Sequence, residues 1–176
     1  MDKCLGCYTC AMACKNLYHQ DKGIAWRRLH SLSQDIWPHS ERAWISLACN
    51  HCEHPACLKA CPAKAYYKRD DGIVVHDESR CIGCRNCVRN CPYGAPQYNR
   101  TEGRVEKCSL CYQRIDAGLK PACVQSCPVG ALELVDVVEM TDTARFPAGF
   151  PYYPQLNPSV RFMTARAPMM FGREEK

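Results

Sequence analysis

The chain has 176 residues, which is enough for one domain or two small fused modules but not for a large hydrophobic core. Its formal net charge of +5 counts every thiol as neutral, so this charge alone does not establish a nucleic-acid-binding surface. Sixteen residues are cysteine, a density typical of a secreted disulfide scaffold or of a metal-loaded protein. No apolar run reaches roughly eighteen residues, so we expect no membrane span. Met1-Asp2-Lys3 also lacks the apolar segment of a signal peptide, which disfavours the secreted scaffold.

The cysteines fall into four quartets along the chain, and no cysteine is left over. Quartet one is Cys4, Cys7, Cys10 and Cys14; quartet two is Cys49, Cys52, Cys57 and Cys61; quartet three is Cys81, Cys84, Cys87 and Cys91; quartet four is Cys108, Cys111, Cys123 and Cys127. The first two cysteines of each quartet are separated by two residues, so they lie on one tight loop, and Gly6 and Gly83 suit such a turn. The last two are four residues apart, so a short helix would bring both to one face.

The residue after the fourth cysteine distinguishes quartet one from the others. Pro62, Pro92 and Pro128 follow the last cysteine of quartets two, three and four. Proline cannot continue a helix, so we expect each of them to end the helix and to send the chain away in an extended conformation. Lys15 follows Cys14 instead, so the helix of quartet one is expected to continue further.

Short strands are expected between and beside the quartets. The sequence predicts strands at 43–47 and 131–135, and β-prone runs on both sides of Asp70-Asp71-Gly72 predict a hairpin across residues 65–76. Residues 15–48 form an insertion that carries Trp26, Trp37 and Trp44, which we expect to pack against a partner or over a metal site. Residues 136–176 contain no cysteine and are punctuated by prolines, so we expect an extended, partner-binding arm.

Repeated tight cysteine quartets are typical of ligands to 4Fe–4S clusters. Zinc sites usually use two well-separated cysteine pairs, and cysteines two or three residues apart cannot easily form disulfides, so both alternatives are disfavoured. The six histidines, among them His51 and His54, replace no cysteine and are interpreted as surface or supporting groups. Four oxidised clusters would add a charge of about −8 and bring the net charge to about −3. The basic balance is therefore interpreted as partial compensation for anionic cofactors, and we expect no nucleic-acid partner.

The sequence resembles the iron–sulfur beta subunits of the dimethyl sulfoxide reductase family over residues 1–135. The resemblance is carried by the four quartets, by residues 91–98 (CPYGAPQY) and by residues 107–114 (KCSLCYQR) leading to 121–128 (PACVQSCP). It implies four 4Fe–4S clusters and a large catalytic subunit that contains molybdenum or tungsten bound to pterins. Some relatives have tryptophan at the position of Cys84 and hold a three-iron cluster, whereas this chain keeps the cysteine. Relatives of the formate dehydrogenase type carry a C-terminal membrane helix on this subunit; residues 136–176 do not resemble one, so we expect any membrane attachment to come from another subunit.

The resemblance also implies an α+β fold of two fused two-cluster ferredoxin-like modules, with short hairpins and helices and an irregular extended C-terminal arm. The outer module would comprise residues 1–14 and 96–135, the insertion residues 15–48, the inner module residues 49–95, and the arm residues 136–176. The implied ligand sets are nested: Cys4, Cys7, Cys10 and Cys127; Cys14, Cys108, Cys111 and Cys123; Cys49, Cys52, Cys57 and Cys91; Cys61, Cys81, Cys84 and Cys87. Spacing alone does not favour this arrangement over pairing of adjacent quartets.

We therefore expect a non-catalytic electron-transfer subunit. It would relay electrons between the pterin-metal subunit and a quinone-linked membrane subunit or a soluble carrier. The alternatives are a stand-alone polyferredoxin and an iron–sulfur subunit of a hydrogenase or formate-linked complex. The compartment stays open, because relatives are often exported together with a signal-bearing partner. The sequence begins only three residues before Cys4, where a strand would be expected, so either the natural start lies upstream or a partner supplies that edge.

Overall fold

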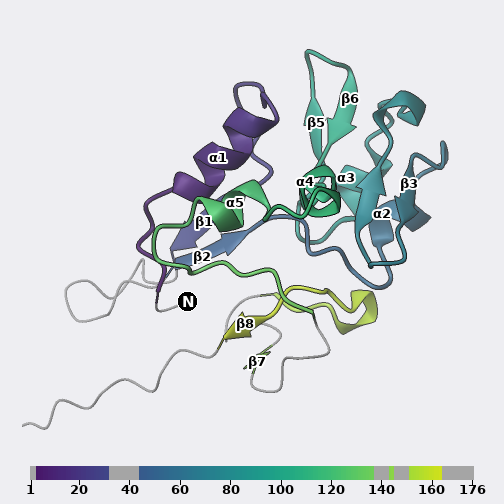
Figure 1. Ribbon diagram of the computed structural model, residues 1–176. Coiled ribbons are helices and arrows are strands. Elements are labelled where there is room, and N and C mark those ends of the chain that lie inside the picture. Colours follow the sequence, from purple (N-terminus) through teal and green to yellow (C-terminus); the bar gives the residue numbers. More distant parts are fainter. Residues whose placement is uncertain (1–2, 32–43, 137–142, 145–150, 164–176) are drawn as a thin grey trace, which may run out of the picture.

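The computed structural model describes residues 3–31, 44–136, 143–144 and 151–163 of the chain (Figure 1). In these ranges the chain forms short helices and two-stranded antiparallel hairpins. The hairpins pair β1 (Arg28–Ser31) with β2 (Trp44–Leu47), β3 (Tyr66–Lys68) with β4 (Val74–His76), β5 (Gln97–Asn99) with β6 (Arg104–Glu106), and β7 (Thr143–Ala144) with β8 (Phe162–Met163). The helices are α1 (Thr9–Leu17), α2 (Ala56–Lys59), α3 (Asn86–Asn90), α4 (Tyr112–Asp116) and α5 (Ala122–Gln125), with 3-10 turns η1 (Glu78–Arg80) and η3 (Pro154–Leu156). The fold is a small α+β structure, as predicted.

Two of the three predicted strand regions are confirmed. Strand β2 occupies the predicted region 43–47, and β3 pairs with β4 around the predicted turn, where Gly72 adopts a φ of +82°. The strand predicted at 131–135 is wrong, because residues 131–136 have no regular secondary structure. Leu134 and Val135 are exposed there, and no described strand pairs with this segment. An apolar run without a hydrogen-bonding neighbour does not form a strand, whatever its propensity.

The helix of quartet one is longer than the others, as predicted. It continues to Leu17, three residues beyond Cys14, whereas α2, α3 and α5 all end before the fourth cysteine of their quartets. The prolines end these helices, but the chain does not leave them extended, so that part of the prediction is wrong. The chain instead makes a tight turn, in which the carbonyl of the fourth cysteine accepts a hydrogen bond from the backbone N–H of the residue three positions later. The donors are Lys64, Gly94 and Gly130, at distances of 3.3, 3.1 and 3.3 Å.

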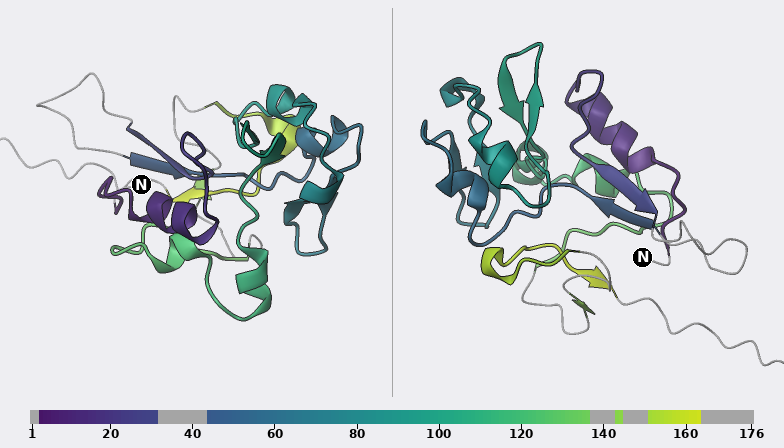
Figure 2. Two further views of the ribbon diagram at one scale, coloured as in Figure 1. Left: turned by 90° about the horizontal axis from the view of Figure 1, so that it is seen from above. Right: turned by 180° about the vertical axis from the view of Figure 1, so that it is seen from behind.

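The helices pack in two pairs that join segments far apart in the sequence. Helix α1 contacts α5, and α2 contacts α3 (Figures 1 and 2). The apolar core is small and includes cysteines: one cluster of buried residues contains Cys57, Tyr66, Val74 and Cys87, and the other contains Cys14, Trp26 and Cys108. The chain therefore places its candidate ligands where a larger domain would place aliphatic side chains.

Residues 151–163 of the predicted arm lie against residues 50–54 of the same chain. The backbone carbonyls of Leu156 and Asn157 accept hydrogen bonds from His54 and Glu53, at 3.1 and 2.9 Å. Ser159 also donates to the carbonyl of Asn50 at 2.9 Å. This segment therefore covers quartet two of its own chain. Residues 137–142, 145–150 and 164–176 of the arm, like Trp37, lie outside the described residues, and contact of the arm with a partner stays a prediction.

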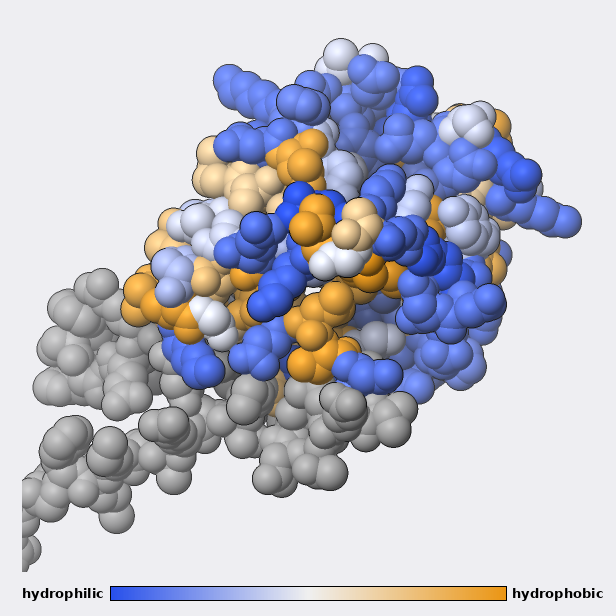
Figure 3. Space-filling model, in the orientation of Figure 1, coloured by the Kyte–Doolittle hydropathy of each residue, from blue (hydrophilic) through white to orange (hydrophobic). Residues whose placement is uncertain are grey.

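No helix within the described part of the chain is both long enough and apolar enough to cross a membrane. On the face drawn in Figure 3, apolar side chains are scattered among hydrophilic ones.

Candidate metal centres

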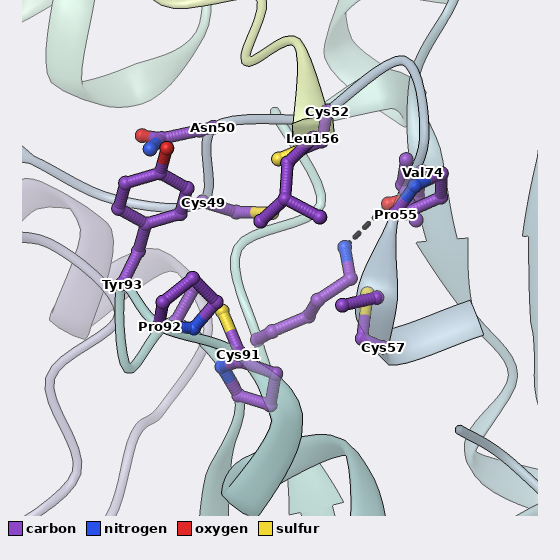
Figure 4. A pocket seen from close by; sticks show the side chains of 14 residues that line it. Cys49, Asn50, Cys52, Pro55, Cys57, Val74, Cys91, Pro92, Tyr93 and Leu156 are labelled. Atoms are coloured by element: carbon purple, nitrogen blue, oxygen red, sulfur yellow. Dashed lines mark hydrogen bonds between the residues drawn. The ribbon is translucent and has the colours of Figure 1, made fainter. Parts of the chain in front are cut away.

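One pocket brings together four cysteines from two quartets. Cys49, Cys52, Cys57 and Cys91 line it, and Figure 4 shows their sulfur atoms pointing toward its middle. The first three come from quartet two and the last from quartet three. Burial raises the pKa of the Cys52 and Cys57 thiols to about 12, and the neighbouring charges of Cys49 and Cys91 act in the same direction. Ionised thiolates crowded together in such a buried site are costly unless a cation joins them, so the arrangement suits a metal centre.

A second group joins quartet one to quartet four. Burial, followed by the charge of Cys108, raises the pKa of the Cys14 thiol to about 12, and Cys123 acts in the same direction. Burial also raises the pKa of Cys123, with contributions from the charges of Cys108 and Cys111. The structure thus places Cys14 near cysteines that lie about a hundred residues further along the chain, because α1 packs against α5.

The other two expected groups again combine quartets two and three, and quartets one and four. Cys61 and Cys81 pack against the core cluster that contains Cys87, and their charges help burial to raise the pKa of Cys87. Cys84 lies in the loop before α3, with intermediate exposure. The remaining group is expected at the outer end of the molecule. There Cys10 is buried in α1 beside α5, Cys4 and Cys127 have intermediate exposure, and Cys7 is exposed.

Hydrogen-bond donors point at several of the cysteine sulfurs. After the proline turns, the backbone N–H of Ala65 donates to Cys61 Sγ at 3.3 Å, and that of Ala131 donates to Cys127 Sγ at 3.2 Å. Leu110 donates in the same way to Cys108 Sγ at 3.4 Å. Such bonds stabilise negative charge on sulfur and help to set the reduction potential of an iron–sulfur cluster.

Cys14 receives its donor from a side chain. The amide Nε2 of the buried Gln20 donates to Cys14 Sγ at 3.3 Å and to the Cys14 carbonyl at 3.1 Å. The Oε1 of Gln20 accepts a hydrogen bond from the backbone N–H of Trp26 at 3.1 Å. Both ends of the amide are therefore used, which fixes its orientation toward the sulfur.

Two buried polar side chains within quartet two have atoms without a partner among the described residues. His51 Nδ1 accepts a hydrogen bond from the Val74 backbone at 3.1 Å, so Nε2 carries the proton, yet Nε2 is buried without a partner among the described residues. The amide of Asn50, which lines the pocket, is in the same state. An unpaired buried donor costs about 1–3 kcal/mol. All sixteen thiols are free and four of them converge in the pocket, so the donor set fits a 4Fe–4S cluster.

Two basic residues lie among the cysteines. Arg27 donates hydrogen bonds to the carbonyl and hydroxyl oxygens of Ser46, at 3.2 and 3.0 Å. Burial acts to lower the pKa of Arg27, but the charges of Cys123, Cys108, Cys10 and Cys14 together raise it. Lys107 is buried and lines the four-cysteine pocket. The sequence alone identifies neither residue, because nothing in it distinguishes a buried cation from an exposed one. Only the position of Lys107 directly before Cys108 is a signal.

Comparison with known proteins decides the family. A model described as a 4Fe-4S dicluster domain matches residues 41–137, and a 4Fe-4S binding domain matches residues 1–17. Over 146 residues the sequence is 45% identical to one chain of the anaerobic dimethyl sulfoxide reductase of Escherichia coli (strain K12), an alignment that covers 78% of this chain and 71% of that one. The protein belongs to the iron–sulfur subunits of the dimethyl sulfoxide reductase family. All four quartets lie within the two matched ranges.

More distant members of this family are also reductase subunits. The sequence is 37% identical over 138 residues to one subunit of the tetrathionate reductase of Salmonella typhimurium, covering 77% of this chain and 55% of that one. It is 31% identical over 202 residues to the beta subunit of the chlorate reductase of Ideonella dechloratans, covering 72% and 62%. Membership in this family makes the protein a ferredoxin-like 4Fe–4S subunit that serves electron transfer.

Proposed function

We propose that the chain holds four 4Fe–4S clusters in nested ligand sets and relays electrons along them. The observation that carries this proposal is the pairing of α1 with α5 and of α2 with α3, which favours exchange of ligands between quartets one and four and between two and three. Pairing of adjacent quartets would instead require α1 to face α2. The four-cysteine pocket, with three thiols from quartet two and one from quartet three, supports the nested arrangement.

The same proximities suggest the order of the clusters. The charge of Cys108 acts on Cys49, so the cluster of Cys14 and the cluster of Cys49 would be neighbours. The clusters of Cys4 and Cys61 would then lie at the two ends of the wire. Each cluster is a one-electron centre, and its potential would be set by hydrogen bonds to sulfur, by burial and by nearby charge.

Exposed apolar side chains at both proposed ends support docking of partners there. Leu5 follows Cys4 and is 66% exposed, and Ile82 follows Cys81 and is 68% exposed. Because the relatives are each named as a single chain or subunit of a reductase, we propose that a catalytic subunit docks at one end. That subunit would carry molybdenum or tungsten bound to pterins and would perform the catalysis. A quinone-linked membrane subunit or a soluble carrier would dock at the other end.

Anaerobic purification from native cells tests the proposal. The expected result is co-elution with a larger subunit that contains molybdenum or tungsten, and about sixteen iron atoms per copy of this chain. Iron, zinc, nickel, molybdenum and tungsten are measured by mass spectrometry on the same fractions. A chain that eluted alone with its iron would be a polyferredoxin, and a nickel-containing partner would indicate a hydrogenase. Bound zinc in place of iron would refute the cluster assignment itself.

A further inference from the structure

Lys107 is a buried cation held in a fixed position. It follows β6 directly and is only 4% exposed. Its Nζ donates to the backbone carbonyl of Val74 in β4, the bond that is dashed in Figure 4, and to the carbonyl of Cys108 at 2.9 Å. These two carbonyls hold the ammonium group in place, but they carry no net charge and cannot neutralise it.

Within the part of the chain that the structure describes, Lys107 forms no ion pair with a carboxylate. Every ion pair found among the described residues involves other side chains. Burial of an ammonium group without a counter-charge is costly, so proteins pair such groups or place them beside an anionic cofactor. The pocket that Lys107 lines contains four thiols that fit an anionic cluster, and this cluster would be the missing counter-charge.

Lys107 also lies where two candidate centres come together. On one side it lines the same pocket as Cys49, Cys52, Cys57 and Cys91. On its other side, Lys107 precedes Cys108 and binds its carbonyl, and Cys108 is part of the group of Cys14. The same cation therefore faces one candidate ligand set from each ferredoxin-like module.

We propose that Lys107 is a fixed positive charge shared by the two central clusters, where it raises the reduction potential of both. The inference rests on the proposed four-cluster wire. A cluster with its four thiolates passes from a total charge of about −2 to about −3 when it takes one electron from its neighbour. A buried cation stabilises the reduced form more than the oxidised form, because Coulomb attraction grows with the cluster charge and is weakly screened in the interior. Lys107 thus favours residence of the electron at the junction of the two modules.

Replacing Lys107 with glutamine separates the charge from the hydrogen bonds. The amide of Lys107→Gln keeps N–H donors for the carbonyls but carries no charge. The matched control is Lys59→Gln, which removes an exposed lysine of α2 two residues before Cys61. Both variants are purified anaerobically in the native complex, their iron is counted, and their clusters are titrated with dithionite under electron paramagnetic resonance.

We expect Lys107→Gln to lower the reduced-to-oxidised ratio of two of the four centres at a fixed solution potential. The fall should be at least tenfold, which corresponds to 59 mV for a one-electron couple. The other two centres, and all four centres of Lys59→Gln, should change less than threefold. Unchanged potentials in a fully loaded Lys107→Gln variant, an equal shift of all four centres, or an equal shift in the control would overturn the inference.

A second variant, Lys107→Arg, retains the positive charge and is measured in case Lys107→Gln does not bind its full complement of iron. Lys107→Arg should then keep about sixteen iron atoms and the potentials of the unaltered protein. Loss of clusters in both variants would make Lys107 a purely structural residue and would overturn the inference as well. If Lys107→Gln kept four centres with unchanged potentials, the inference about Lys107 would be wrong but the proposed four-cluster function would not be affected. Fewer than four centres in the unaltered protein would refute the four-cluster function itself.

Discussion

Gly83 lies in the loop between Cys81 and Cys84, and the structure allows only glycine there. Its φ is +69°, in the left-handed region, and a Cβ at this position would overlap the backbone carbonyl oxygen of Gly103 in the turn between β5 and β6. An alanine in the left-handed region costs about 1–2 kcal/mol. The overlap with the backbone would force the cysteine loop and the hairpin apart, which adds about 1–3 kcal/mol, as for other overpacked sites.

Gly103→Ala is the matched control for Gly83→Ala. Gly103 has nearly the same φ, +67°, but no atom lies within contact distance of the Cβ it would gain. We therefore expect Gly103→Ala to lose about 1–2 kcal/mol of the free energy of unfolding from backbone strain alone. Gly83→Ala should lose about 2–5 kcal/mol in total, together with some of its iron.

The comparison is made by anaerobic denaturant unfolding of the iron-loaded variants, followed by iron analysis of the folded fractions. If both variants lost the same stability and both kept all their iron, the close approach between the cysteine loop and the β5–β6 turn would have no energetic consequence. The reasoning from the position of Gly83 would then be wrong.

Three further changes probe the candidate centres. Cys84→Ser should lose or remodel one inner cluster and remove about one to four iron atoms, so electron delivery to the partner should slow; unchanged iron content and turnover would refute this. Gln20→Leu removes the N–H donor to Cys14 Sγ and leaves the Trp26 N–H without its acceptor. We expect a loss of about 1–3 kcal/mol in stability and a lower reduction potential for the cluster of Cys14, and a titration with four unchanged potentials would contradict the second expectation. Removal of iron with a chelator should abolish the near-ultraviolet circular dichroism, because both groups of buried core residues contain cysteines. A native spectrum after removal of iron would show that the core is stable without metal.

Local structure was predictable where a short motif determines it. The Asp70-Asp71-Gly72 turn predicted the β3–β4 hairpin, and the four-residue spacing within each quartet predicted the short helices. The β5–β6 hairpin was missed, although its turn carries a signal: the Asn99 side chain accepts hydrogen bonds from the N–H groups of Thr101 and Glu102, and Gly103 supplies the positive φ. A polar residue that binds its own turn is readable from sequence.

Long-range features were not predictable from the spacing of residues. The contact between α1 and α5 joins segments about a hundred residues apart, and only the resemblance to a family favoured it over pairing of adjacent quartets. The burial of Lys107 and the approach of Arg27 to the cysteines depend on the same contacts between segments. A basic residue in a sequence is usually exposed, so its burial becomes visible only when the modules are assembled.

The absence of proline after Cys14 has a consequence for the electronic environment of its sulfur. In quartet two the proline turn frees the N–H of Ala65, four residues after Cys61, to donate to Cys61 Sγ. In quartet one the helix continues, and the N–H of Tyr18, again four residues on, donates to the Cys14 carbonyl instead. The sulfur of Cys14 then needs another donor, and Gln20 supplies it. A backbone donor persists through almost any substitution, whereas a side-chain donor is lost by one, so the potential of the Cys14 cluster is sensitive to a single substitution at Gln20.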